Sequence, residues 1–171
     1  VIVGAGATGA EFAYLWRAYG SEVTLVELLP RLVPLEDEDV SKELERSFRR
    51  QGISAMTGSM VEGVELVGDG ARVTVSRGQE QTVIDCDKVL VAVGMQGNID
   101  GIGLDEVGVE TDRGSIPVDG AMQTNVSGVY AIGDVTGKSL LAHVASAQGV
   151  TAIESIAGLE PPVLDYELMP R

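Results

Sequence analysis

The sequence of 171 residues has little cysteine, few aromatic side chains and no long hydrophobic run. Its one cysteine, Cys86, cannot form a disulfide within the chain, which fits a reducing compartment and predicts a cytoplasmic protein. Aromatic residues make up 4% of the chain, too few for a surface that stacks on single-stranded nucleic acid. The longest apolar runs, such as residues 89–93, have the length of a strand, whereas a membrane-spanning helix needs about 20 apolar residues.

Positive charge is also scarce. The chain carries 12 basic and 26 acidic residues, a formal net charge of −14. DNA, RNA and anionic membranes would be repelled, so we expect neither nucleic acid nor membrane as a partner. No cluster of residues has the spacing of metal ligands, and we expect no metal site. The sequence opens on Val1 in a strand-like run without a basic signal-peptide start, so we expect it to be a piece of a longer protein.

Glycine, in contrast, is abundant, with 22 of the 171 residues against an average of roughly 7%. The clearest pattern is Gly-Ala-Gly-Ala-Thr-Gly at residues 4–9, which follows a strand-like run at 1–3. A helical spacing of apolar residues over 11–19 comes next, and a β-rich segment at 22–27 follows it. Strand, glycine turn, helix and strand in this order predict a βαβ unit.

In such a unit each glycine has a separate task. Gly4 permits the tight turn, Gly6 leaves room for a pyrophosphate, and Gly9 lets helix and strand pack closely. The amino end of the helix offers free N–H groups and a positive dipole end to phosphates. Glu27 ends the second strand, where an acid accepts the ribose hydroxyls of NAD and repels the extra phosphate of NADP. The alternatives are a glycine turn without a ligand and an ordinary surface glutamate.

Three other positions have simpler interpretations from the residues alone. Glu11 is expected in the first turn of the helix, where it would stabilise the helix dipole. Cys86 is expected to be a small buried side chain beside a strand. His143, the single histidine, stands at the start of a later helix with no acidic or basic partner visible in the sequence.

The remainder of the first half predicts more of the same layered architecture. A second helix opens near Asp37 and ends at Gly52, and a third parallel strand is expected at 53–56. Three runs of period 2 then predict an antiparallel meander, and a fully apolar run predicts a strand buried on both faces. These runs are 61–67, 71–76, 82–84 and 89–93.

A linker-like stretch rich in glycine places a domain boundary near residue 98, which gives domains 1–98 and 99–171. The elements expected in the second domain are two strands and a helix, at 115–118, 129–132 and 140–156. The predicted fold class is therefore α/β, with a Rossmann-like parallel sheet and an antiparallel β-meander followed by a partial second α/β domain.

Three segments together resemble the dihydrolipoamide dehydrogenase family of flavin disulfide reductases, and the match covers essentially the whole chain. The first runs from VIVGAGATGAEFA to VTLVE, the second is DKVLVAVGMQGN, and the third is TNVSGVYAIGD followed by SLLAHVASAQG. The resemblance implies an NAD-binding domain at 1–98 and the C-terminal half of an FAD-binding domain at 99–171. Where the family often has Arg-x-Pro-Asn, this chain has Met95-Gln96-Gly97-Asn98.

The resemblance also implies roles for the matching residues. Besides the three glycines at the NAD pyrophosphate, Glu11 would face the nicotinamide and Glu27 would hold the adenosine ribose. Val61 would contact the adenine through its backbone, and Gly94 would lie beside the nicotinamide. Asp134 would hydrogen-bond the ribityl chain of FAD. A further segment would approach the flavin ring through backbone groups, namely Leu140, Leu141, Ala142 and His143.

In the family a dithiol reduces the active disulfide, electrons pass to FAD, and a hydride goes to NAD. The first flavin glycine motif and the redox cysteine pair are expected upstream, and the interface domain with the catalytic histidine downstream. We therefore expect no catalytic residue in this chain, an incomplete FAD site and no activity by itself. The implied partners are those two missing parts, the lipoyl domains of a 2-oxo acid dehydrogenase complex, and a second copy of the parent in a homodimer. Another pyridine nucleotide-disulfide oxidoreductase, or a nucleotide-binding module without catalysis, remains an alternative.

Overall fold

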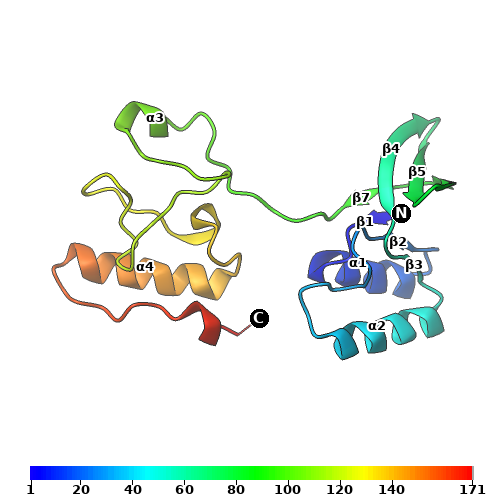
Figure 1. Ribbon diagram of the computed structural model, residues 1–171, viewed down its shortest axis with the longest axis horizontal. Coiled ribbons are helices and arrows are strands. Elements are labelled where there is room, and N and C mark those ends of the chain that lie inside the picture. The colour runs from blue at the N-terminus through cyan, green and yellow to red at the C-terminus, as the bar shows by residue number, and fades with distance from the viewer. Residues whose placement is uncertain (171) are drawn as a thin grey trace. The chain divides into compact units, whose positions relative to one another are not determined.

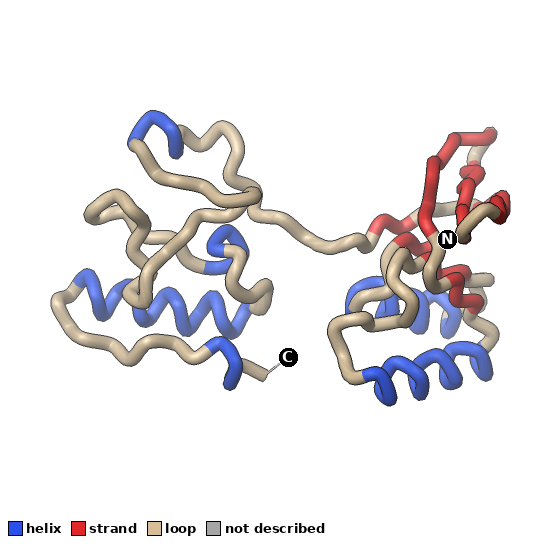
Figure 2. The backbone as a smooth tube through the Cα atoms, viewed as in Figure 1, coloured by secondary structure: helices blue, strands red, loops and turns tan. Residues whose placement is uncertain are grey.

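The computed structural model describes residues 1–170, and the chain divides into two compact units, the first Val1–Gly94 and the second beginning at Met95. Figure 1 follows the chain from the blue amino end into the second unit, and Figure 2 separates strands from loops. The division falls a few residues before the boundary expected near residue 98. What each unit binds stays a prediction.

A parallel sheet of four short strands forms the centre of the first unit, in the order β3-β2-β1-β7. The strands are β1 (Ile2–Val3), β2 (Thr24–Val26), β3 (Ser54–Met56) and β7 (Leu90–Val91). Ile2 and Leu25 are fully buried in the core that the sheet shares with its helices. The βαβ unit predicted for the first residues is confirmed, because β1 and β2 are parallel neighbours joined by a helix.

That helix is α1 (Ala7–Ala18), and it packs on the sheet with its smallest side chains. Its buried residues are Gly9, Ala10 and Ala13. The large side chains of Phe12 and Leu15 are 37% and 41% exposed, so the apolar spacing predicted the helix but does not mark its buried face. Small residues let the helix axis come close to β1, and this close approach permits the tight glycine turn that joins the two elements.

The second helix, α2 (Glu38–Gln51), has the ends that the sequence predicts. The carboxylate of Asp37 accepts the backbone N–H of Asp39 at 2.8 Å and so caps the first turn. Gly52 ends the helix in the left-handed conformation, with φ at 77°, which glycine adopts without steric cost. Phe48 turns inward and is buried in the core of the unit.

Three long antiparallel strands form the predicted meander, β4 (Met60–Val67), β5 (Gly70–Arg77) and β6 (Glu80–Cys86). Strand β5 alternates, with Val73 and Val75 buried against Val26 of the parallel sheet. The opposite face carries a cross-strand ion pair, in which Arg72 Nε donates to Asp85 Oδ1 at 2.8 Å. The meander is thus a second layer over the parallel sheet.

The expectation that residues 89–93 are buried on both faces is wrong in this structure. Strand β7 comprises only Leu90–Val91, and it stands at the edge of the sheet with β1 as its one partner. Val91 is 66% exposed and Val93 is 70% exposed. An edge strand has no neighbour on its outer side, so a run of valines there does not imply burial.

The second unit packs one long helix, α4 (Ala142–Ile156), against loops and short helical turns. The short elements are α3 (Leu104–Val107) and the 3-10 turns η1 (Gly133–Thr136) and η2 (Tyr166–Leu168). A small core of aliphatic residues holds the loops together, with Ile99, Val109, Ile116 and Ala131 buried. The helix predicted over residues 140–156 is confirmed to within two residues at its start.

The strands expected at 115–118 and 129–132 are wrong, because the described residues of this unit form isolated bridges only. Asp112 pairs with Ser115, and Gln123 pairs with Tyr130. Each segment makes single backbone contacts, such as the Ile116 N–H to the Val135 carbonyl at 2.7 Å, and no successive ladder. Alternating apolar residues predict a strand only where a neighbouring strand supplies the ladder. The α/β class with its parallel and antiparallel sheets is confirmed.

Candidate functional site

The candidate site lies at the carboxyl edge of the parallel sheet. The chain runs along β1, β2 and β3 to one side of the sheet and then adds β7 on the other side of β1. This change of direction is a topological switch point, where α/β sheets bind ligands beyond the carboxyl ends of their strands. The glycine turn follows β1 there, Glu27 follows β2, and Gly94 lies three residues beyond the end of β7.

The three glycines of the turn meet different surroundings. A Cβ atom on Gly4 would lie 2.4 Å from the carbonyl oxygen of Ala92, and one on Gly9 would lie 2.0 Å from the carbonyl oxygen of Gly4. Neither position accepts a larger residue without a backbone shift. A Cβ atom on Gly6 would meet no atom within 4 Å. Gly6 therefore borders open space at the amino end of α1, while Gly4 and Gly9 build the turn itself.

Glu27 supports the same turn from the neighbouring strand. Its side chain is 7% exposed, and its Oε2 accepts the N–H of Ala5 at 2.7 Å. Its Oε1 accepts the N–H of Leu29 at 2.8 Å. A carboxylate offers about four lone-pair positions, so two acceptor positions remain for ribose hydroxyls. The sequence indicated a ligand contact here, and the structure adds a bridge between the glycine turn and the next loop.

That loop, residues 28–36, is docked against the glycine turn. Leu32 is fully buried in the core, and the N–H of Val33 donates to the carbonyl of Ala5 at 2.8 Å. Val33 has φ at 40°, a conformation that β-branched residues rarely adopt. Arg31 donates to the carbonyls of Pro34 at 2.9 Å and Glu36 at 3.3 Å. The only cation between β2 and α2 is therefore engaged by its own loop.

Three further predicted residues take clear positions. Glu11 is the fifth residue of α1 and is exposed, so the expectation that it stands in the first turn is wrong. Because the dipole effect fades beyond the first turn, that simpler role loses its basis. Val61 lies in β4, the edge strand of the meander, beside a bulge between Val61 and Gly63. Gly94 is exposed with φ at 120°, and a Cβ atom there would meet nothing within 4 Å.

The residues implied to face a flavin belong to the second unit. Asp134 is exposed in the 3-10 turn η1, and within residues 1–170 its carboxylate has no hydrogen-bond or ion-pair partner. Leu141 is the N-cap of α4 and leads into Ala142 and His143. The His143 ring nitrogen Nε2 lies 3.0 Å from the carbonyl oxygen of Pro170. The amino end of α4 thus combines free backbone N–H groups with a histidine that is engaged by the chain's last segment.

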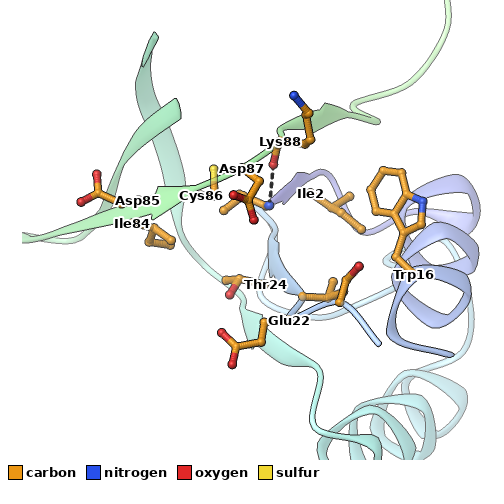
Figure 3. A pocket seen from close by; sticks show the side chains of 12 residues that line it. Ile2, Trp16, Glu22, Thr24, Ile84, Asp85, Cys86, Asp87 and Lys88 are labelled. Atoms are coloured by element: carbon orange, nitrogen blue, oxygen red, sulfur yellow. Dashed lines mark hydrogen bonds between the residues drawn. The ribbon is translucent and has the colours of Figure 1, made fainter. Parts of the chain in front are cut away.

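A pocket of the first unit lies away from the glycine turn. It has a volume of about 450 Å³ and opens at the amino ends of the parallel strands, the edge opposite the glycine turn (Figure 3). Trp16, Cys86 and Asp87 are among its lining residues, and the Val1 amino group donates to the Lys88 carbonyl at 2.9 Å. Cys86 is partly buried beside the meander core, close to the expectation of a small apolar side chain.

Two exposed clusters of charged side chains away from the glycine turn have shifted pKa values. Hydrogen bonding to Arg72 holds the pKa of Asp85 below its ordinary value. On α2, hydrogen bonds to Glu38 and Asp39 raise the pKa of Lys42.

Across residues 1–170 no group of three acidic, histidine or cysteine side chains is placed to hold a metal ion. In the same range, no helix combines the length and the apolar character needed to cross a bilayer.

A glycine turn at the switch point of a parallel sheet, with an acid at the end of the next strand, is the arrangement found in α/β folds of the dinucleotide-binding type. The family model described as pyridine nucleotide-disulphide oxidoreductase matches residues 1–149. The chain belongs to this family of oxidoreductases.

Its relatives include dihydrolipoyl dehydrogenases, which confirms the predicted resemblance. The chain is 53% identical over 173 residues to the one from Mycobacterium leprae and 46% identical over 172 residues to the one from Chlorobaculum tepidum. Each alignment covers 100% of this chain and 37% of the relative, so the chain spans little more than a third of their length.

Solved structures agree with this assignment. The structure of LpdA from Mycobacterium tuberculosis matches with a TM-score of 0.87 and 33% identity, over 96% of this chain and 35% of that one. The flavoprotein disulfide reductase RclA from Escherichia coli, in its Cu(II) complex, matches with a TM-score of 0.83 and 25% identity, over 91% of this chain and 34% of that one.

Proposed function

We propose that this chain is the NAD-binding part, with a portion of the FAD-binding part, of an NAD-dependent dihydrolipoyl dehydrogenase. In the whole protein, dihydrolipoyl groups would reduce the active disulfide, electrons would pass from the reduced disulfide to FAD, and a hydride would go from FAD to NAD. The relatives that align over all of this chain carry that enzyme's name. Lipoyl domains and a second subunit as partners, and a cytoplasmic location, stay predictions of the same proposal.

The observation that carries the proposal is the open position at Gly6. The glycine turn is fixed by the N–H of Gly4, which donates to the Val26 carbonyl at 2.8 Å, and by the contacts of Ala5. Gly6 caps α1, and a Cβ atom there would meet nothing within 4 Å, so its open side and the amino end of the helix form one surface. A pyrophosphate fits this cradle because backbone N–H groups and the helix dipole both favour negative charge.

The preference for NAD over NADP rests on the charges near Glu27. Its carboxylate retains acceptor positions for ribose hydroxyls and would repel a phosphate on the ribose. The nearest following cation, Arg31, is directed to the carbonyls of its own loop. Accommodation of NADP normally needs an arginine free to pair with that phosphate.

The FAD portion of the proposal rests on Asp134 and the amino end of α4. The free carboxylate of Asp134 is suited to accept hydrogen bonds from a polyol such as a ribityl chain. The amino end of α4, with residues 140–143, would place N–H groups and a positive dipole end toward an electron-rich ring. These residues form one wall of a site, and a second glycine turn would be needed for the FAD pyrophosphate.

Calorimetric titration of the chain with NADH and with NADPH tests the proposal. We expect NADH to bind at least about tenfold more tightly, a difference of about 1.4 kcal/mol. Glu27→Gln should reduce this ratio because the repelling charge is lost. Glu22→Gln is the matched control, since Glu22 is an exposed acid near the amino end of the same strand. Equal affinity for the two nucleotides would remove Glu27 from the site and contradict the NAD assignment.

A further inference from the structure

A buried glutamine links the segments of the second unit that the flavin proposal uses. Gln148, on the inner face of α4, is fully buried with 0% exposure. Its Oε1 accepts the N–H of Gly133 at 2.6 Å. Its Nε2 donates to the hydroxyl of Tyr166 at 2.9 Å and, at 3.4 Å, to that of Thr136. One side chain therefore links α4 to two other segments, η1 and η2.

The backbone of Gly133 is held on both sides by this network. Its N–H is bonded to Gln148, and its carbonyl accepts the hydroxyl of Thr136 at 2.8 Å. Gly133 has φ at 78°, a left-handed conformation that sets the direction of the chain into Asp134. Two side-chain bonds on one glycine fix the orientation of both adjoining peptide planes.

The fixed turn leaves one functional group free. Gly133 and Thr136 are buried at the ends of η1, whereas Asp134 between them is exposed. In the described chain no partner engages the Asp134 carboxylate. The buried amide of Gln148 makes its hydrogen bonds within the protein, whereas the exposed carboxylate of Asp134 makes none among the described residues. This arrangement is expected where a buried side chain holds a turn that presents a functional group to a ligand.

We propose that Gln148 is a positioning residue, which holds the η1 turn so that Asp134 faces a flavin ribityl chain. The inference rests on the proposed function for the identity of the ligand. The support of the turn does not depend on the ligand, because it is the hydrogen bond from the Gly133 N–H to Gln148. The glycine and acid patterns of the sequence predicted neither the support of this turn nor a role for Gln148.

Variants at Gln148 separate its acceptor from its donor. Gln148→Ala removes both and leaves the Gly133 N–H buried without a partner. Gln148→Glu keeps an acceptor for Gly133, and the Tyr166 hydroxyl can rotate to donate to it while the Thr136 hydroxyl keeps donating to the Gly133 carbonyl. Thr151→Ala is the matched control, because Thr151 is buried on the same helix and its hydroxyl makes no hydrogen bond to η1.

Amide hydrogen exchange of the full chain, followed by NMR, tests the support of the turn. We expect Gln148→Ala to speed exchange of the Gly133 amide at least about tenfold, while the amides of α4 stay protected. Gln148→Glu should restore the protection, and Thr151→Ala should leave Gly133 unchanged. Unchanged protection in Gln148→Ala, or an equal loss in Thr151→Ala, would overturn the positioning role.

Titration of the same labelled chain with FAD at millimolar concentration tests the ligand. We expect chemical shift changes at Gly133–Thr136 that Gln148→Ala diminishes and Gln148→Glu retains. Asp134→Asn should remove the changes without altering the exchange of Gly133. If FAD leaves the chemical shifts of these amides unchanged in the chain without substitutions, the flavin part of the inference is wrong. The exchange experiment decides the role of Gln148 independently, and NADH titration decides the first unit's function.

Discussion

Replacement of Gly6 by valine separates binding from folding in the first unit. The residue has φ at −69° and precedes α1, so a side chain there strains neither the backbone nor a neighbour. Valine is a poorer N-cap than glycine, and we expect a loss of stability of about 1 kcal/mol or less. The branched side chain would fill the space proposed for the pyrophosphate, so NADH affinity should fall by at least about tenfold, or 1.4 kcal/mol.

Gly9→Ala is the contrasting variant. Its Cβ atom would lie 2.0 Å from the Gly4 carbonyl oxygen, so helix and strand must separate. Overpacking of this kind costs about 3 kcal/mol at the upper end of the usual range. For a unit of this size the unfolding temperature should fall by roughly 12–24 °C, against less than about 8 °C for Gly6→Val.

Thermal unfolding by circular dichroism and calorimetric titration with NADH, applied to both variants, give the answer. The expected pattern is a folded Gly6→Val chain that fails to bind, beside a strongly destabilised Gly9→Ala chain. A folded Gly6→Val chain that binds NADH as tightly as the unsubstituted chain would refute the proposed cradle. Equal unfolding temperatures for Gly9→Ala and the unsubstituted chain would refute the close packing of helix and strand.

Three further outcomes are expected. Glu27→Gln should lower stability by about 1–3 kcal/mol, since its amide group cannot accept from both Ala5 and Leu29, and thermal unfolding measures this loss. Arg72 lowers the pKa of folded Asp85, so the pair stabilises the fold above the unfolded-state pKa and this contribution fades as pH falls through the folded value. Asp85→Asn should therefore reduce the loss of stability between neutral pH and about pH 3, as followed by denaturant unfolding; an unchanged loss would contradict the pair's contribution. The purified chain should be colourless and without dihydrolipoamide turnover, and a flavin absorbance spectrum at full occupancy would contradict the incomplete site.

The sequence predicted those parts of the fold that depend on local chemistry. The glycine turn, the Asp37 cap and the Gly52 end of α2 each follow from a residue whose conformational preference dominates its surroundings. The period-2 runs likewise predicted the meander, and β5 alternates between buried and more exposed residues. Where one residue type permits one backbone geometry, the pattern in the sequence is sufficient.

Features set by neighbours could not be predicted in this way. The edge position of β7 exposes Val91, and the apolar residues at 129–132 lack a partner strand, although both runs have strong β propensity. The placement of Glu11 in the second turn depends on α1 beginning at Ala7. The two backbone bonds of Glu27 and the network of Gln148 join residues distant in sequence, for which no spacing rule exists.

The pairing of β1 with β7 also has a consequence for the time course of folding. Ile2 pairs with Leu90, so this contact must close a loop that contains α1, α2 and the whole meander. The meander consists of hairpins with short turns, and such local contacts form early, whereas distant pairings form late. The carbonyl of Ala92 reaches Gly4 only when this last strand docks. We therefore expect the nucleotide cradle to mature at the end of folding, after most of the secondary structure around it has formed.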